Sequence, residues 1–136
     1  MGDRGNVVIV AGEVPPIYLY THWDGTELPG ILADALGRRL RWTDDSYLAR
    51  IIFDEMTKGR QGEETGYGIS AYMTDNEHPL LVVDVDRQEV RVIDSDAVVF
   101  DPHAGIAFSF TDYVEAFSGA QFSYGDDGIE YVSALR

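Results

Sequence analysis

The sequence predicts an α+β fold, with a mostly antiparallel sheet, a two-helix layer on one face and a short C-terminal helix. Strand-like and helix-like segments occur in blocks, not in strict alternation: strands, two helices, more strands and a final helix. The helical segments are amphipathic, as expected for helices that cover one face of a sheet. Because no internal repeat or long linker is present, residues 1–136 are predicted to form a single domain.

The first two strands are predicted from β-branched and alternating residues. Residues 6–12, NVVIVAG, form an apolar run that ends at a glycine, and residues 17–23 then alternate in polarity. Pro15 and Pro16 lie between the two runs, so we expect a hairpin that turns around these prolines.

Two helices are predicted next from apolar residues spaced i, i+3 and i+4. Thr26 is the expected N-cap of the first, whose apolar positions are Leu28, Ile31, Leu32, Ala35, Leu36 and Leu40. The second is expected to be capped by Asp44 or Asp45 and to end at Gly59. Its apolar stripe comprises Leu48, Ile51, Ile52 and Met56.

After the second helix, the polarity of the side chains again alternates with the period of two that is typical of strands. Residues 65–73 are predicted to form a strand, and residues 80–94 a hairpin. If residues 86–89 form the hairpin loop, the valines share one face and Asp84 lies opposite Arg91 on the other.

The C-terminal part contains two more strand candidates, residues 97–100 and 105–110. Ser109 followed by Asp112 resembles a capping box and predicts a short helix. Residues 120–136 are expected to be an appended strand or a docking tail.

The charge is strongly negative, with 24 acidic and 10 basic residues, a net charge of −14 and a pI near 4.3. This charge opposes direct binding to nucleic acid or to an anionic membrane. Three explanations stay open: adaptation to a salty cytoplasm, a high-GC genome, or imitation of a phosphate backbone. With no cysteine and no apolar run of the ~20 residues that span a membrane, a cytoplasmic protein is expected.

The segment IYLYTHWDG, residues 17–25, is the richest in candidate binding groups. Strand alternation places Ile17, Leu19, Thr21 and Trp23 on one face, and Tyr18, Tyr20, His22 and Asp24 on the other. The second set combines rings with polar groups, which suits a binding surface. The alternative is that another element covers this face.

Pairs of carboxylates suggest a second candidate surface. Asp84 and Asp86 would project from one strand face ~6.6 Å apart, close to the ~7 Å phosphate step of DNA. Such a pair would suit a host or viral protein partner, for example one that handles nucleic acid.

Catalytic and metal sites are less well supported. His22 near Asp24, or Ser70, could serve a small hydrolase or transferase, but GISAY around Ser70 lacks the second glycine of a nucleophile elbow. Each histidine has an aspartate nearby, in the pairs His22 with Asp24, His78 with Asp75, and His103 with Asp101. Aspartate is so frequent here that these pairs predict no metal site, and we expect no cofactor and assign no catalytic residue.

Several strings together resemble a family of small uncharacterised proteins of actinobacteria, haloarchaea and their viruses: GDRGN, IYLYTHWDG, YLARIIFDEM, ETGYGIS and DNEHPLLVVDVDRQEV, at residues 2–6, 17–25, 47–56, 64–70 and 75–90. The resemblance covers roughly residues 2–93 and carries no known activity, cofactor or functional residue. It implies a virus or mobile-element accessory protein, or a host gene acquired from one.

The function expected from these observations is that of a non-enzymatic acidic binding protein that engages or inhibits a host protein. The alternatives are a small hydrolase or transferase that uses His22 with Asp24 or Ser70, and a virion or scaffold component with a salt-adapted acidic surface.

Overall fold

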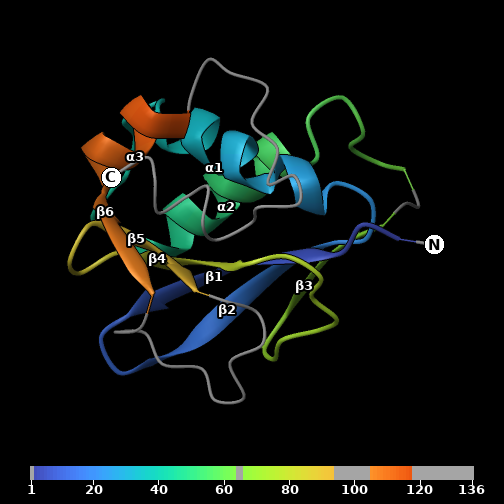
Figure 1. Ribbon diagram of the computed structural model, residues 1–136, viewed down its shortest axis with the longest axis horizontal. Helices are drawn as coiled ribbons and strands as arrows, with labels where there is room; N and C mark the ends of the chain where they lie inside the picture. Colours follow the sequence, from blue (N-terminus) through green and yellow to red (C-terminus); the bar gives the residue numbers. More distant parts are fainter. Residues whose placement is uncertain (1, 64–65, 94–104, 118–136) are drawn as a thin grey trace.

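The computed structural model describes residues 2–63, 66–93 and 105–117, in which helices cover one face of a six-stranded sheet (Figure 1). The elements, in chain order, are β1 Gly5–Ala11, β2 Val14–Thr21, a short 3-10 helix Gly25–Glu27, α1 Leu28–Leu36, α2 Asp45–Met56, β3 Tyr67–Ser70, β4 Leu80–Asp84, β5 Glu89–Ile93, β6 Ile106–Ser109 and α3 Phe110–Phe117. The predicted α+β class is confirmed.

The strand order is β3-β2-β1-β4-β5-β6. β1 and β4 pair in parallel, whereas the other four neighbouring pairs are antiparallel. β1 and β2 form one hairpin and β4 and β5 another, and α1 and α2 cross the sheet between them (Figure 1). The sheet is therefore mostly antiparallel, as predicted.

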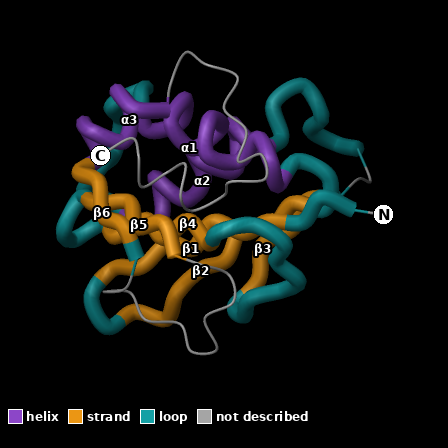
Figure 2. Tube along the Cα trace, in the orientation of Figure 1, coloured by secondary structure: helices purple, strands orange, loops and turns teal. Residues whose placement is uncertain are grey.

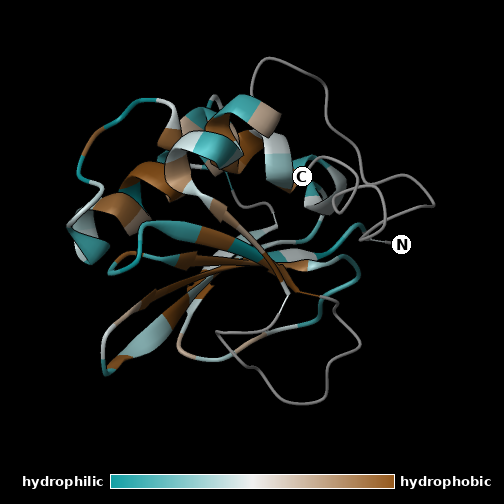
Figure 3. Cartoon of the chain, turned by 60° about the vertical axis from the view of Figure 1, so that its left-hand side comes forward, coloured by the Kyte–Doolittle hydropathy of each residue, from teal (hydrophilic) through white to brown (hydrophobic). Residues whose placement is uncertain are grey.

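The main core lies between the sheet and the helices. Alternate side chains of β1, β4 and β5 pack against α1 and α2, which is why these strands are mainly hydrophobic in Figure 3. Tyr113 and Phe117 of α3 stack with ring centroids 4.4 Å apart, and α3 joins this core. A smaller cluster that contains Val8 and Val82 lies on the other face of the sheet.

The hairpin between β1 and β2 turns earlier than predicted. Ala11 pairs with Val14, and Gly12 in the turn has a φ of 54°, a left-handed conformation that glycine adopts without strain. Pro15 and Pro16 lie inside β2, not in the turn. They are tolerated there because β3 pairs with β2 only from Tyr18 onward, so no neighbour on that side needs their missing N–H groups.

The first helix differs from its prediction at both ends. It begins at Leu28, after Glu27. Thr26, the predicted N-cap, lies in the preceding 3-10 helix, where its backbone N–H donates to the Asp3 carboxylate at 2.9 Å. The helix ends at Leu36, before Leu40. Its last carbonyl accepts a hydrogen bond from the Trp42 indole at 3.1 Å.

The other helix caps agree with the sequence. Asp44 accepts a hydrogen bond from the N–H of Tyr47 at 3.2 Å and caps α2, which ends at Met56, before Gly59. The Ser109 hydroxyl accepts from the N–H of Asp112 at 3.0 Å and caps α3, as the predicted capping box requires.

The hairpin of β4 and β5 has a different register from the predicted one. Asp84 pairs with Glu89, and Arg91 pairs with Val82, so the predicted opposition of Asp84 and Arg91 is wrong. The cause is a turn one position earlier, in which the Asp84 carboxylate accepts from the N–H of Arg87 at 3.1 Å. Compared with the prediction, each residue of β4 pairs with a residue two positions earlier in β5. Because side chains alternate between faces, a shift of two keeps the valines on the same face of the sheet.

Two predicted segments, residues 97–100 and the tail 120–136, lie outside the described residues. In the described part of the chain, no helix combines the length and the apolar character needed to cross a membrane.

Candidate functional site

The predicted alternation of side chains along β2 is observed up to the end of the strand. Leu19 and Thr21 are buried on the helix side, whereas Tyr18 and Tyr20 lie on the opposite face and are half-buried. The strand ends at Thr21, so the pattern does not extend to Trp23, which is 51% exposed instead of facing the core.

A loop covers part of the face that carries the tyrosines. Asn6 and Tyr20 are neighbours in the sheet and share this face. The buried Asn6 amide donates to the backbone carbonyls of Thr74 and Asp75 at 3.4 and 3.1 Å. The chain between β3 and β4 therefore crosses the sheet beside Tyr20, which explains why this face is half-buried and not fully open.

His22 forms an aromatic cluster with its neighbours. The Tyr20 hydroxyl lies 3.0 Å from the Nδ1 atom of His22, and Arg4 Nε donates to the same atom at 3.4 Å. Because a guanidinium only donates, Nδ1 is an acceptor, and the arrangement assigns the ring proton to Nε2. The Trp23 ring packs edge-on at 4.3 Å.

Asp24 does not pair with His22. Instead, the Tyr67 hydroxyl donates a hydrogen bond to the Asp24 carboxylate. Burial raises the pKa of Tyr67 to about 12, and the hydrogen bond to the Asp24 carboxylate adds to this rise. The Ser70 hydroxyl donates to the carbonyl of Tyr72 at 2.5 Å. The three groups of the hydrolase or transferase alternative are thus each bonded elsewhere.

A polar cluster lies at the start of the chain, where Asp3 meets three other segments. Its carboxylate bonds the His78 ring and the N–H of Thr26, while its backbone bonds His22 and Gly25 at 2.7 Å each. Burial by itself would raise the pKa of Asp3, but the hydrogen bonds from His78 and Thr26 outweigh it, and the pKa is lowered.

The cluster contains the residue types of a catalytic triad but not its geometry. Thr26 Oγ1 lies 3.5 Å from Nε2 of His78, and the Asp3 carboxylate contacts the same nitrogen. A triad needs the carboxylate on one ring nitrogen and the hydroxyl on the other, so that the second nitrogen can take a proton. We conclude that Asp3, Thr26 and His78 have a structural role and hold distant segments of the chain together.

Segments that lie far apart in the sequence meet at this cluster. Residues 2–6, 22–26, 66–67 and 74–78 come together through the bonds described above, and Glu77 adds reciprocal bonds with Arg4 at 3.1 and 2.9 Å. The sequence did not reveal the cluster, because each segment supplies only one or two groups. His78 was paired with Asp75 by proximity in sequence, whereas its partner in the structure is Asp3.

Exposed apolar side chains gather around β3. Within the described residues, β3 pairs with β2 alone and forms one edge of the sheet. Four exposed large side chains flank it and define what we call the β3 edge surface: Trp23 (51% exposed), Ile69 (62%), Tyr72 (69%) and Met73 (44%). Sequence analysis missed this surface, although the strand YGIS followed by AYM carried the signal.

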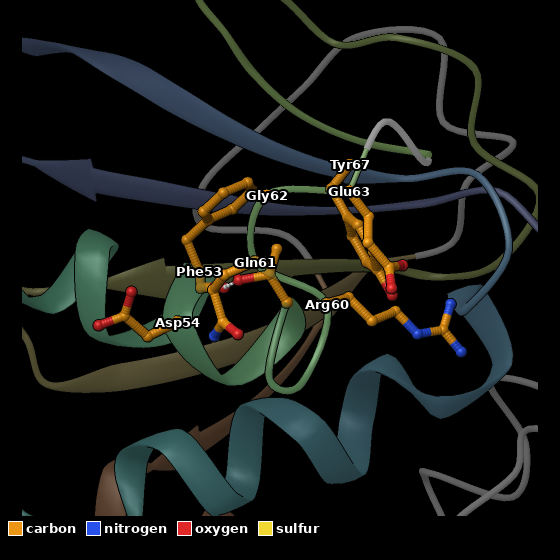
Figure 4. A pocket seen from close by; sticks show the side chains of 8 residues that line it. Phe53, Asp54, Arg60, Gln61, Gly62, Glu63 and Tyr67 are labelled. Atoms are coloured by element: carbon orange, nitrogen blue, oxygen red, sulfur yellow. Dashed lines mark hydrogen bonds between the residues drawn. The ribbon is translucent and has the colours of Figure 1, made fainter.

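A shallow pocket of about 330 Å³ lies between the end of α2 and β3 (Figure 4). Its walls are formed by Phe53, Asp54, Thr57, Arg60, Gln61, Gly62, Glu63 and Tyr67. The carboxylates and the guanidinium give it mixed charge, and Arg60 points away from Asp54. The Tyr67 hydroxyl is already used by Asp24, so the pocket lacks a complete set of reactive groups.

The predicted acidic pair lies elsewhere. Asp84 is only 8% exposed and holds its own turn, whereas Asp86 is exposed in that turn. Asp84 is next to Val10 at one end of β1, and Tyr20 is next to Asn6 at the other. The six predicted binding residues therefore do not form one surface.

The described residues contain no group of three or more histidine, aspartate or glutamate side chains placed to hold a metal ion. His103 lies outside them. Comparison with protein-family models, with curated proteins and with solved structures finds no match for this chain.

Proposed function

We propose that this protein is a non-enzymatic acidic binding protein that engages a host protein in the cytoplasm through the β3 edge surface. The observation that carries the proposal is the concentration of exposed Trp23, Ile69, Tyr72 and Met73 around an edge strand. Such patches mark contact sites, because burying them on binding releases water from apolar surface.

The backbone of β3 supports the same function. An edge strand presents unpaired N–H and C=O groups, to which an extended segment of a partner can add as a further strand. Gly68 lies opposite Tyr20, and a side chain at Gly68 would meet nothing within 4 Å. The face of β3 is therefore open at Gly68, and the aromatic side chains at the ends of the strand can act as anchors.

The charge indicates the chemistry of the partner. A net charge of −14 attracts a basic protein and accelerates its association. A nucleic-acid-handling protein with a basic groove fits this requirement, and occupation of that groove would inhibit it. The family resemblance supports the role of a virus or mobile-element accessory protein.

The experiment is affinity capture of host proteins by the tagged protein with single-site variants. We expect a basic protein to be retained by the wild type and lost with Tyr72→Ser or Ile69→Thr. The matched control is Val14→Thr, which alters a side chain that is 56% exposed at the start of β2, before the part of β2 that pairs with β3. Retention of the same basic protein by the β3 variants, or its loss with the control, would refute this surface.

A virion or scaffold component would behave differently in the same experiment. It would be retained with many copies of itself or with a structural protein, and the acidic surface would serve only solubility. Such a result would replace the binding function proposed here.

A further inference from the structure

The loop between α1 and α2 concentrates positive charge in this acidic protein. We define the arginine loop as residues 38–42, RRLRW, which hold three of the ten basic residues of the chain. The loop packs beside α3, with the Trp42 ring 5.3 Å from Phe110, and lies on the opposite side of the molecule from β3 (Figure 2).

The backbone of the arginine loop is held in an unfavourable conformation. Arg39 and Arg41 have φ angles of 57° and 58°, in the left-handed region that residues with a side chain rarely adopt. The surrounding bonds hold it there: the Trp42 indole donates to Leu36, and the N–H of Asp44 donates to the carbonyl of Arg41 at 3.1 Å. Conformations of this kind cluster at binding sites, where they present side chains in a fixed arrangement.

Among the described residues, two of the three guanidinium groups have no carboxylate partner. Arg38 bonds Glu55 at 3.1 Å, but Arg39 lies over the Trp42 ring at 5.3 Å and Arg41 over the Tyr47 ring at 4.5 Å. Within residues 2–63, 66–93 and 105–117, no carboxylate reaches ion-pair distance of either arginine. A guanidinium that lies over a ring can still donate hydrogen bonds to an acceptor through its N–H groups.

A purely structural role explains only part of this arrangement. Arg38 and Arg39 follow the C-terminal end of α1, where positive charge stabilises the helix dipole. Arg41 lies three residues before Asp44, the N-cap of α2, and positive charge near a helix N-terminus gains nothing from the helix dipole. The stability of the two helices therefore gives no reason for an arginine at position 41.

Exposed apolar groups complete the surface. Leu40 is 53% exposed between the two arginines, and Tyr47 is 48% exposed beneath Arg41. The surface therefore offers two cationic forks and apolar area next to them. A carboxylate-bearing chain with one apolar side chain matches both features.

We propose that the arginine loop binds an acidic segment of a partner protein, with carboxylates paired to Arg39 and Arg41 and an apolar side chain on Leu40 and Tyr47. Arginine forks bind carboxylates through two parallel hydrogen bonds. A nucleic acid is less suitable, because a long polyanion would extend from the loop over a protein of net charge −14. A short acidic segment would contact only the arginine loop and would not extend over the rest of the negatively charged protein. This second surface is independent of the β3 edge surface.

The test is fluorescence anisotropy with a short labelled peptide that is rich in aspartate and contains one leucine. We expect saturable binding that weakens with salt, and binding about tenfold weaker for the double variant Arg39→Gln with Arg41→Gln, since two exposed ion pairs are lost. Lysine at both positions should weaken binding less, because the charge remains and the fork is lost. The matched control is Arg50→Gln, which removes an exposed arginine of α2 that is paired with Asp54.

Three results would overturn the proposal. These are absence of saturable peptide binding by the wild type, equal weakening by Arg50→Gln, and tighter binding of a single-stranded oligonucleotide than of the peptide. Nuclear magnetic resonance gives a second measurement on the wild-type protein. The indole signal of Trp42 should shift on addition of the peptide, and an unchanged signal would also count against the loop as the binding site.

Discussion

The carboxylate of Asp3 is hydrogen-bonded to the ring of His78, 75 residues further along the chain. The same carboxylate accepts from the N–H of Thr26 at 2.9 Å, at the start of the helical layer. One side chain therefore connects the beginning of the chain, the turn into α1 and the segment that leads into β4. The backbone N–H of Asp3 also donates to the carbonyl of His22, the residue before Trp23 of the β3 edge surface.

Replacement of Asp3 by alanine should destabilise the protein. The change removes the hydrogen-bond acceptor of Thr26 and the partner of His78, and loss of a cap of this kind costs ~1 kcal/mol. The free energy of unfolding, measured by denaturant titration, should fall by about this amount. Asp86→Ala is the control, because Asp86 is exposed in a turn; an equal loss there would show that the contacts of Asp3 contribute nothing specific.

The contribution of Asp3 should depend on pH. Burial by itself would raise its pKa, but the hydrogen bonds from His78 and Thr26 hold the pKa below the ordinary value of an aspartate. A lowered pKa in the folded state stabilises the protein above the unfolded pKa, and this stabilisation is lost as the pH falls through the folded pKa. The difference in unfolding free energy between the wild type and Asp3→Ala should therefore shrink below about pH 4. A difference that stays constant to lower pH would contradict this.

Tyr67 should titrate late in alkali. Burial, followed by the hydrogen bond to Asp24, raises its pKa from 10.0 to about 12. Its stabilising contribution is full below the unfolded pKa and is lost as the pH rises through the folded value, that is, from about 10 to about 12. The tyrosinate absorbance of Tyr67→Phe, subtracted from that of the wild type, should show one group with a midpoint near 12. Asp24→Asn should move this midpoint toward 10.0, and a midpoint that stays in place would exclude Asp24 as a cause.

Gly66→Ala should disturb the aromatic end of the β3 edge surface. Gly66 has a φ of 47°, and a Cβ there would lie 2.7 Å from Cδ1 of Trp23. The matched control is Gly59→Ala, at a φ of 79° with nothing within 4 Å of the added atom. Both changes carry the cost of a left-handed residue, ~1 kcal/mol. Gly66→Ala should destabilise the protein more than Gly59→Ala does, and it should shift the tryptophan fluorescence. Equal effects of the two changes would show that Trp23 can move aside for the added Cβ.

Local sequence patterns predicted the presence of helices and strands better than the residues at which they begin and end. The caps at Asp44 and Ser109 were predictable because a cap depends on residues within one turn of the helix. The start of α1 was not, because Thr26, the predicted cap, lies in the 3-10 helix before α1 and its N–H bonds Asp3 from a distant segment. The hairpin turn at Gly12 was missed because two prolines signal a turn more strongly than one glycine.

The candidate site was predictable only in part. The alternation of Tyr18 and Tyr20 with Leu19 followed from strand geometry, which depends on neighbouring residues. The expected pairing of His22 with Asp24 failed because β2 ends at Thr21, after which side chains no longer alternate. Asp24 then found Tyr67 on the neighbouring strand, a contact that no spacing in the sequence indicates.

The sequence by itself determined the fold class, the apolar faces of the strands and helices, and the acidic character of the surface, because each depends on composition or on residues close in the chain. Tertiary structure alone decided that Asp3 meets His78. It also decided that, in the part of the chain that the structure describes, β3 lies at an edge with apolar groups exposed, and the exposed Arg39 and Arg41 contact rings instead of carboxylates. These features depend on the order of strands and on contacts between distant segments. The energy of each such contact is small, and each contact requires a specific geometry. These contacts therefore leave no periodic pattern in the sequence.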